Sequence, residues 1–151
     1  MKNILVSACL LGTECRYDGG SVKADRIEEL AELCCLIPVC PEIYGGLPTP
    51  RIPSERIGEK VRNREGEDVT AQYRKGAETA LAFARFWNCS YALLKERSPS
   101  CGKGIIYDGT FSGTLRSGNG LTAELLEKNG IIIYGESRIG ELIEEIQRCG
   151  S

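Results

Sequence analysis

The chain has 151 residues, of which 42% are apolar and 26% charged, a composition typical of one ordinary globular domain in the range of ~100–200 residues. Its 19 basic and 21 acidic residues leave a net charge of −2, so it lacks the basic face with which proteins bind nucleic-acid polymers through their phosphates. It contains no histidine, which excludes Ser-His-Asp and Cys-His catalysis and histidine-ligated metals.

Short apolar runs rich in branched residues alternate with helical patterns along the chain. The runs predict buried strands at residues 4–8, 36–39, 90–95 and 131–134. The helical patterns cover residues 26–34 with Asp25 as N-cap, 69–88 with Asp68 as N-cap, 122–129 closed by Gly130, and 139–148. Pro38 favours an edge position for the second strand.

Two further segments interrupt this alternation. Five of the six prolines lie between residues 38 and 53, so we expect an irregular, ordered wall there, followed by a mobile charged stretch at 58–68. Asp108-Gly109, between 105–107 and 110–112, predicts a tight β-hairpin. The whole order predicts a single α/β domain over residues 1–151, with a parallel Rossmann- or flavodoxin-like sheet, helices on both faces and a small β-hairpin insertion.

The compartment follows from the cysteines and from the start of the chain. A chain of this length builds its own core, so its eight cysteines are expected to be thiols in a reducing cytoplasm rather than disulfides. Residues 6–9 imitate a lipoprotein cleavage box, but the apolar run before Cys9 is too short for a signal peptide. No run reaches the ~20 apolar residues of a membrane span. We therefore expect a cytoplasmic protein with no membrane partner.

Three cysteines follow three of the predicted strands. Cys9 and Cys40 come directly after the first two strands, and Cys101 lies in the loop after the third. Ligands of open parallel sheets bind beyond the carboxyl ends of the strands, so these thiols should meet at one edge. Crowded thiolates repel one another unless a metal or cations accompany them. Without histidine, an all-thiolate site selects zinc or an iron–sulfur cluster.

The spacing favours the cluster. Structural zinc sites normally use closely spaced Cys-x-x-Cys pairs, which this sequence lacks. Three distant cysteines instead suit a cubane cluster with one iron free of cysteine, open as a Lewis acid. The alternative is that these three cysteines merely pack in the core, as we expect for Cys34, Cys35 and Cys89. Cys149 is expected to be incidental, and Cys15 a bystander or a neighbour of the site rather than a ligand.

Long motifs extend over nearly the whole chain. They are Cys9-Leu10-Leu11-Gly12 with Arg16-Tyr17-Asp18-Gly19, Pro38-Val39-Cys40-Pro41-Glu42 with Gly45-Gly46-Leu47 and Pro50-Arg51, Leu94-Lys95 with Ser98-Pro99-Ser100-Cys101-Gly102, and Tyr107-Asp108-Gly109-Thr110-Phe111-Ser112-Gly113 with Gly120-Leu121-Thr122-Ala123. Together they resemble the thiouracil desulfidase family. The resemblance implies an oxygen-sensitive [4Fe-4S] cluster held by Cys9, Cys40 and Cys101. It also implies non-redox, hydrolytic removal of sulfur from a thiolated nucleobase such as 2-thiouracil, giving the oxo base and hydrogen sulfide.

Side chains beside these cysteines are the candidate catalytic groups. Glu42, two residues after Cys40, is the expected general acid or base, the alternative being a carboxylate that only accepts backbone hydrogen bonds. Ser98 and Ser100 flank the loop of Cys101 and are expected to orient substrate or relay a proton. For Ser100, a hydrogen bond to a cluster sulfur is the alternative.

Further polar residues are candidates for charge balance and substrate contact. Lys95 and Arg51 would offset the negative charge of thiolates and cluster, unless they are simply solvated. Tyr17 and Asp18 would reach the edge of the base, unless they only form a turn. The expected partner is a small thiolated molecule.

Three rival functions stay open at this point. One is a structural zinc protein using Cys9, Cys15, Cys40 and Cys101. A second is a non-catalytic iron–sulfur protein in sulfur trafficking or sensing. The third is a small-molecule binding protein in which the cysteines belong to the core.

Overall fold

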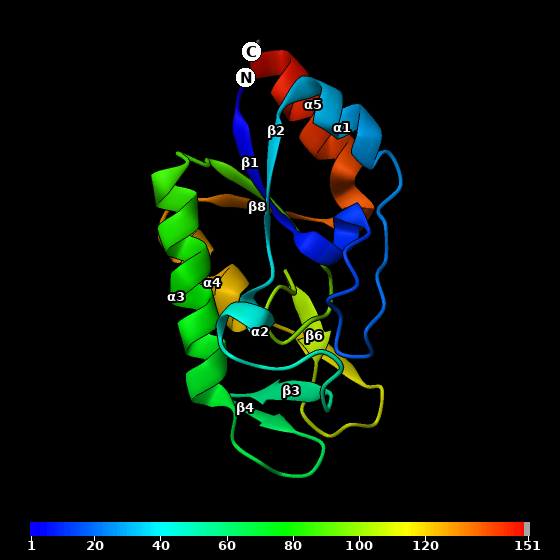
Figure 1. Ribbon diagram of the computed structural model, residues 1–151, viewed down its shortest axis with the longest axis vertical. Helices are drawn as coiled ribbons and strands as arrows, with labels where there is room; N and C mark the ends of the chain where they lie inside the picture. Colours follow the sequence, from blue (N-terminus) through cyan, green and yellow to red (C-terminus); the bar gives the residue numbers. More distant parts are fainter. Residues whose placement is uncertain (150–151) are drawn as a thin grey trace.

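The computed structural model describes residues 1–149, which form a four-stranded parallel sheet and two small antiparallel hairpins (Figure 1). The sheet has the order β2-β1-β5-β8. Its strands are β1 (Asn3–Ser7), β2 (Cys35–Val39), β5 (Tyr91–Leu94) and β8 (Ile132–Gly135). The four predicted strands are thus confirmed, and β2, which contains Pro38, is an edge strand as predicted. Counted along the chain the order is 2-1-3-4, the flavodoxin-like arrangement, whose ligand crevice lies where the strand order reverses.

Two helices cover each face of the sheet (Figure 1). On one face α1 (Ile27–Leu33) and α5 (Ile139–Cys149) enclose a core with β1 and β5. On the other, α3 (Thr70–Phe86) and α4 (Leu121–Lys128) pack over Leu5, Val39 and Leu94. This confirms the predicted α/β class with helices on both faces. Within the helical patterns at 26–34 and 69–88, Ala31 and Trp87 are exposed.

The predicted helix caps differ in outcome. Asp68 accepts a hydrogen bond from the Thr70 backbone N–H at 2.9 Å, so it satisfies the first turn of α3 as predicted, one residue before the formal N-cap Val69. Asp25 does not cap α1, because the chain turns through Arg26, whose φ of 64° places it at the N-cap instead. Gly130 closes α4 with a φ of 83°, as predicted.

The charged stretch at 58–68 contains the turn and the second strand of a hairpin. Strand β3 (Ser54–Ile57) pairs antiparallel with β4 (Lys60–Asn63). Val61 is fully buried, and the buried Arg56 forms an ion pair with Glu124 of α4 at 3.2 Å. The charges therefore dock this hairpin onto the domain.

The second hairpin and the proline-rich wall also differ from prediction. Strand β6 (Ile105–Tyr107) pairs with β7 (Leu115–Ser117), not with residues 110–112, so the predicted two-residue turn is wrong and a loop over 108–114 takes its place. The proline-rich segment contains one helical turn, α2 (Pro41–Tyr44), because Pro41 occupies the first helical position, where its missing N–H is not needed. Short 3₁₀ turns, η1 (Ala8–Leu11) and η2 (Glu136–Arg138), complete the elements. Within residues 1–149, no helix has both the length and the apolar character that a bilayer crossing requires.

Candidate active site

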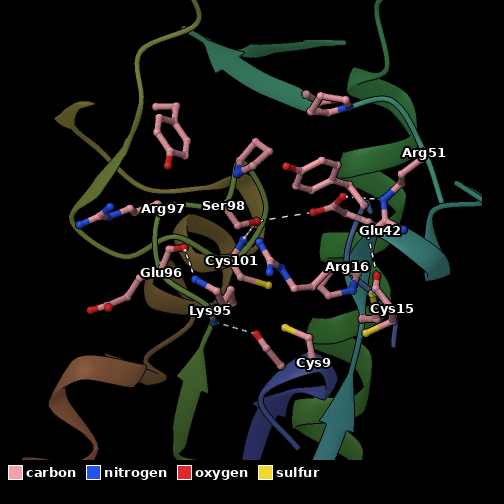
Figure 2. Close-up of a pocket in the computed structure, with 18 of the residues that line it drawn as sticks. Cys9, Cys15, Arg16, Glu42, Arg51, Lys95, Glu96, Arg97, Ser98 and Cys101 are labelled. Carbon is pink, nitrogen blue, oxygen red and sulfur yellow. Dashed lines mark hydrogen bonds and ion pairs between the residues drawn. The ribbon is translucent and has the colours of Figure 1, made fainter. Parts of the chain in front are cut away.

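A cavity of about 570 Å³ lies beyond the carboxyl ends of the sheet strands (Figure 2). Residues of the segments that follow β1, β2 and β5 line it, and both hairpins contribute to its wall. These three strands are neighbours in the sheet, in the order β2-β1-β5. The cavity therefore occupies the crevice expected for this topology.

The three predicted cysteines line this cavity. Cys9 lies in η1 after β1, Cys40 precedes α2 after β2, and Cys101 lies in the loop after β5. Cys9 and Cys101 are buried and Cys40 half-buried, and all eight cysteines of the chain are free thiols. Burial raises the pKa of Cys101 to about 12. A hydrogen bond with Cys15, together with burial, raises the pKa of Cys40 well above its ordinary value. Metal ligation would release protons from these thiols.

The thiol of Cys15 joins the group. Cys15 is buried and lines the same cavity. The Cys40 thiol donates a hydrogen bond to the backbone carbonyl oxygen of Cys15 at 3.8 Å. The hydrogen bond with Cys40 lowers the pKa of Cys15, but contact with Cys9 and burial outweigh this effect and the pKa is raised. Cys15 is thus a close neighbour of the predicted ligands. Of the remaining cysteines, Cys34 and Cys89 are buried as predicted, whereas Cys35 is exposed, contrary to expectation, because it starts edge strand β2.

These residues fit a multi-iron cluster. The donor set is entirely thiol, the ligand class that Fe–S clusters use. Among the residues from 1 to 149, no three cysteines, histidines or carboxylates are placed to hold one metal ion together. Three thiols around one cavity are the donors that such a cluster would need.

Glu42 follows Cys40 by two residues and lines the same cavity. It lies in the first turn of α2, and its side chain is 15% exposed. Its Oε1 accepts a hydrogen bond from Arg51 Nε at 2.8 Å, and its Oε2 accepts one from the Ser98 hydroxyl at 3.5 Å. Arg51, 6% exposed, also donates to the carbonyl oxygen of Cys15 at 2.8 Å. Burial lowers the pKa of Arg51, but the charge of Glu42 outweighs it and the pKa is raised. The Arg51 guanidinium therefore ties Glu42 to the backbone of Cys15.

A glycine contact sets the position of α2. A Cβ at Gly76 of α3 would lie 1.9 Å from the carbonyl oxygen of Pro41. Only glycine lets the two helices approach this closely. The approach fixes the segment that carries both Cys40 and Glu42.

The loop after β5 organises Cys101. The Ser98 hydroxyl accepts hydrogen bonds from the backbone N–H groups of Ser100 and Cys101, both at 3.0 Å. Ser100 is fully buried, pairs with the Thr122 hydroxyl at 2.9 Å and lies 4.0 Å from the Cys101 sulfur. Ser98 thus faces the cavity, whereas Ser100 lies behind the sulfur of Cys101.

Of the predicted residues Lys95, Tyr17 and Asp18, two line the cavity and one does not. Lys95 and Tyr17 line the cavity, but the Lys95 ammonium already forms an ion pair with Glu136 at 2.9 Å. Asp18 lies outside the cavity lining and accepts a hydrogen bond from Gly20 N–H at 2.9 Å, which is turn chemistry.

Sequence reasoning missed several cavity residues. The cationic side chains of Arg16 and Arg97 also line the cavity; Arg16 lies beside the thiols, whereas Arg97 points away from them (Figure 2). Tyr73 of α3 is buried next to Glu42, and burial, together with the Glu42 charge, raises the pKa of its phenol well above the usual value. Phe111 reaches the cavity from the 108–114 loop. Of these four residues, only Arg16 and Phe111 could have been identified from the sequence, because both lie within the motifs that resemble the desulfidase family.

Comparisons with known proteins agree with this site. The model of the 2-thiouracil desulfurase family matches residues 4–138. A Bacillus subtilis (strain 168) protein named uncharacterized protein YbbK is 43% identical over 150 residues, covering 93% of this chain and 99% of the relative. The solved structure of the [4Fe-4S]-dependent thiouracil desulfidase TudS is 44% identical, with a TM-score of 0.92, over 97% of this chain and 99% of that one. The resemblance predicted from the motifs is confirmed: the chain belongs to the 2-thiouracil desulfurase family.

Proposed function

We propose that this protein is a [4Fe-4S]-dependent desulfidase that hydrolyses a thiolated nucleobase such as 2-thiouracil. A thiocarbonyl and water give a carbonyl and hydrogen sulfide, so no electrons are gained or lost. The family and the desulfidase to which the structure is similar support this activity. The observation that carries the proposal is the gathering of three thiols from three neighbouring strands at one cavity.

Cys9, Cys40 and Cys101 would hold the cluster, with Cys15 outside the ligand set. When bound, the cluster supplies an iron without a protein ligand, a soft Lewis acid that suits thiocarbonyl sulfur. Arg16 lies beside the thiols in the same cavity and would offset their negative charge. Lys95 and Arg51 would offset less of the thiolate charge, because each already forms an ion pair with a carboxylate.

Glu42 would act as the general acid and base. Its Oε1 is engaged by Arg51, so Oε2 is the atom that takes a proton from water and returns it to the departing group. The Ser98 hydroxyl, at hydrogen-bond distance from Oε2, would orient the water or relay the proton. Ser100 would support the Cys101 sulfur through its hydroxyl rather than contact substrate.

The chain is proposed to work as one desulfidase-like unit on a small molecule in the cytoplasm. Its eight free thiols favour a reducing compartment.

Oxygen-free purification tests this function. The expected protein is brown, contains equal amounts of iron and acid-labile sulfide, and releases hydrogen sulfide from 2-thiouracil. A colourless protein loaded with zinc would favour the structural zinc alternative. A brown protein that releases no sulfide would favour a sensing or trafficking role.

Single alanine variants test the ligand set. Cys9→Ala, Cys40→Ala and Cys101→Ala should lose iron, because each removes one of three anchoring thiolates. Cys15→Ala and the buried, distant Cys89→Ala are matched controls that should retain it. Loss of iron in Cys15→Ala equal to that in Cys9→Ala would contradict the three-cysteine assignment.

A further inference from the structure

Glu55 is a buried carboxylate in β3 that takes no part in the chemistry described above. Its side chain lies in the cavity wall, and the residue is 8% exposed. One of its oxygens, Oε1, accepts two backbone hydrogen bonds from the 108–114 loop, from Gly109 N–H at 2.9 Å and from Phe111 N–H at 3.1 Å. A carboxylate of the first hairpin thus holds the loop of the second.

The backbone of this loop suits such a partner. Gly109 and Phe111 have φ values of 96° and 56°. The left-handed region carries a steric cost for a bulky residue such as Phe111. Charge-assisted hydrogen bonds to Glu55 compensate this cost.

The loop also packs directly on β3. A Cβ at Gly109 would lie 2.3 Å from the Ile57 side chain. Phe111 lines the cavity, with the Arg64 guanidinium 5.7 Å from the centre of its ring. The position of this aromatic wall therefore depends on the contact between the two hairpins.

We propose that Glu55 is a positioning residue for substrate binding: it fixes the 108–114 loop so that the thiolated ring packs against Phe111. The inference rests on the proposed desulfidase function. An aromatic face is a suitable surface for a planar, polarisable ring. We call the two hydrogen bonds from the loop to Glu55 the clamp. Glu42 and Ser98 lie on other elements, α2 and the loop after β5, so loss of the clamp impairs substrate binding more than the chemical step.

The kinetic test compares three variants for sulfide release from 2-thiouracil. Glu55→Ala should raise KM about tenfold with kcat changed less than about threefold, because only the fraction of molecules with an ordered loop binds substrate. Glu55→Gln keeps an acceptor oxygen and should stay within about threefold of the wild-type KM. Glu59→Ala, which removes an exposed carboxylate from the turn of the same hairpin, should leave both constants unchanged.

A double-mutant cycle identifies Phe111 as the mediator. Phe111→Ala should reproduce the rise in KM, and Glu55→Ala in that background should add less than about twofold, since the wall is already gone. Additive effects would overturn the inference.

Amide hydrogen exchange tests the clamp without turnover. In cluster-free protein, the N–H groups of Gly109 and Phe111 should exchange about tenfold faster in Glu55→Ala than in wild type or Glu59→Ala. Wild-type protein without sulfide release would refute the proposed function, whereas the exchange rates would still test the clamp. Wild-type turnover with an unchanged KM in Glu55→Ala would overturn the positioning role alone.

Discussion

The ion pair between Arg51 and Glu42 gives the sharpest stability prediction. The replacement Arg51→Met keeps most of the side-chain length and removes the charge. In the wild type the guanidinium contacts Glu42 at 2.8 Å, the Cys15 carbonyl at 2.8 Å and the Thr49 hydroxyl at 3.0 Å. The variant leaves the Glu42 carboxylate without its cation.

The magnitude follows from burial. The side chains of Arg51 and Glu42 are 6% and 15% exposed, and breaking a pair of this kind costs about 3–5 kcal/mol because a buried charge is left uncompensated. We expect a loss of this size in the free energy of unfolding of cluster-free protein, measured by urea denaturation. The sulfide-release rate should fall as well, because Glu42 loses its orientation. Adding Glu42→Gln should restore part of the stability, since the orphaned charge is then gone.

Arg26→Met is the matched control. Arg26 Nε contacts Glu29 Oε2 at the same distance, 2.8 Å, but both side chains are about half exposed. Solvent screens this pair, so its loss should leave unfolding close to wild type. Equal destabilisation by Arg51→Met and Arg26→Met would refute the reasoning, because Arg51 is buried and has further hydrogen-bond partners, whereas the Arg26 pair is half exposed.

Two further predictions concern packing and ionisation. Gly76→Ala should destabilise the protein by about 1–3 kcal/mol in urea and lower its iron content, because the new methyl group meets the Pro41 carbonyl. Gly140→Ala in α5, where only a flexible arginine is near, should be neutral or stabilising, and equal losses in both would contradict this account. Burial raises the pKa of Cys89 from 9.0 to about 11, so stability complete below pH 9.0 is lost as the pH rises toward 11. Cys89→Ala should lose less stability over that interval in urea titrations, and a loss equal to wild type would refute the assignment.

The sheet and its helices were predictable because their signals are local. Apolar runs mark β1 and β8, and the 3.6-residue period marks α3 and α5. Once the parallel order is known, the carboxyl ends of the strands define the edge where Cys9, Cys40 and Cys101 must gather. The candidate ligands therefore follow from strand positions and from the family motifs.

The segments that were predicted wrongly are those whose structure depends on contacts between residues distant in the sequence. The Asp108-Gly109 pair predicted a tight turn, yet Glu55, more than fifty residues earlier, draws the loop open by taking its N–H groups. Likewise the ion pairs of Arg56 with Glu124 and of Arg51 with Glu42 join residues that are separated in the sequence. No periodicity or spacing in the sequence reports such pairings.

The same contacts separate the roles of the carboxylates in the cavity wall. Glu55 Oε1 is occupied by two backbone amides, Glu136 by the Lys95 ammonium and the Glu96 N–H, and Glu96 by the Ser137 hydroxyl. Glu42 differs in that its hydroxyl partner, Ser98, also holds the backbone of Cys101. Glu42 therefore lies next to the thiol edge of the cavity, whereas Glu55, Glu136 and Glu96 each hold a loop or a strand end. This is why we assign proton transfer to Glu42 and a positioning role to Glu55.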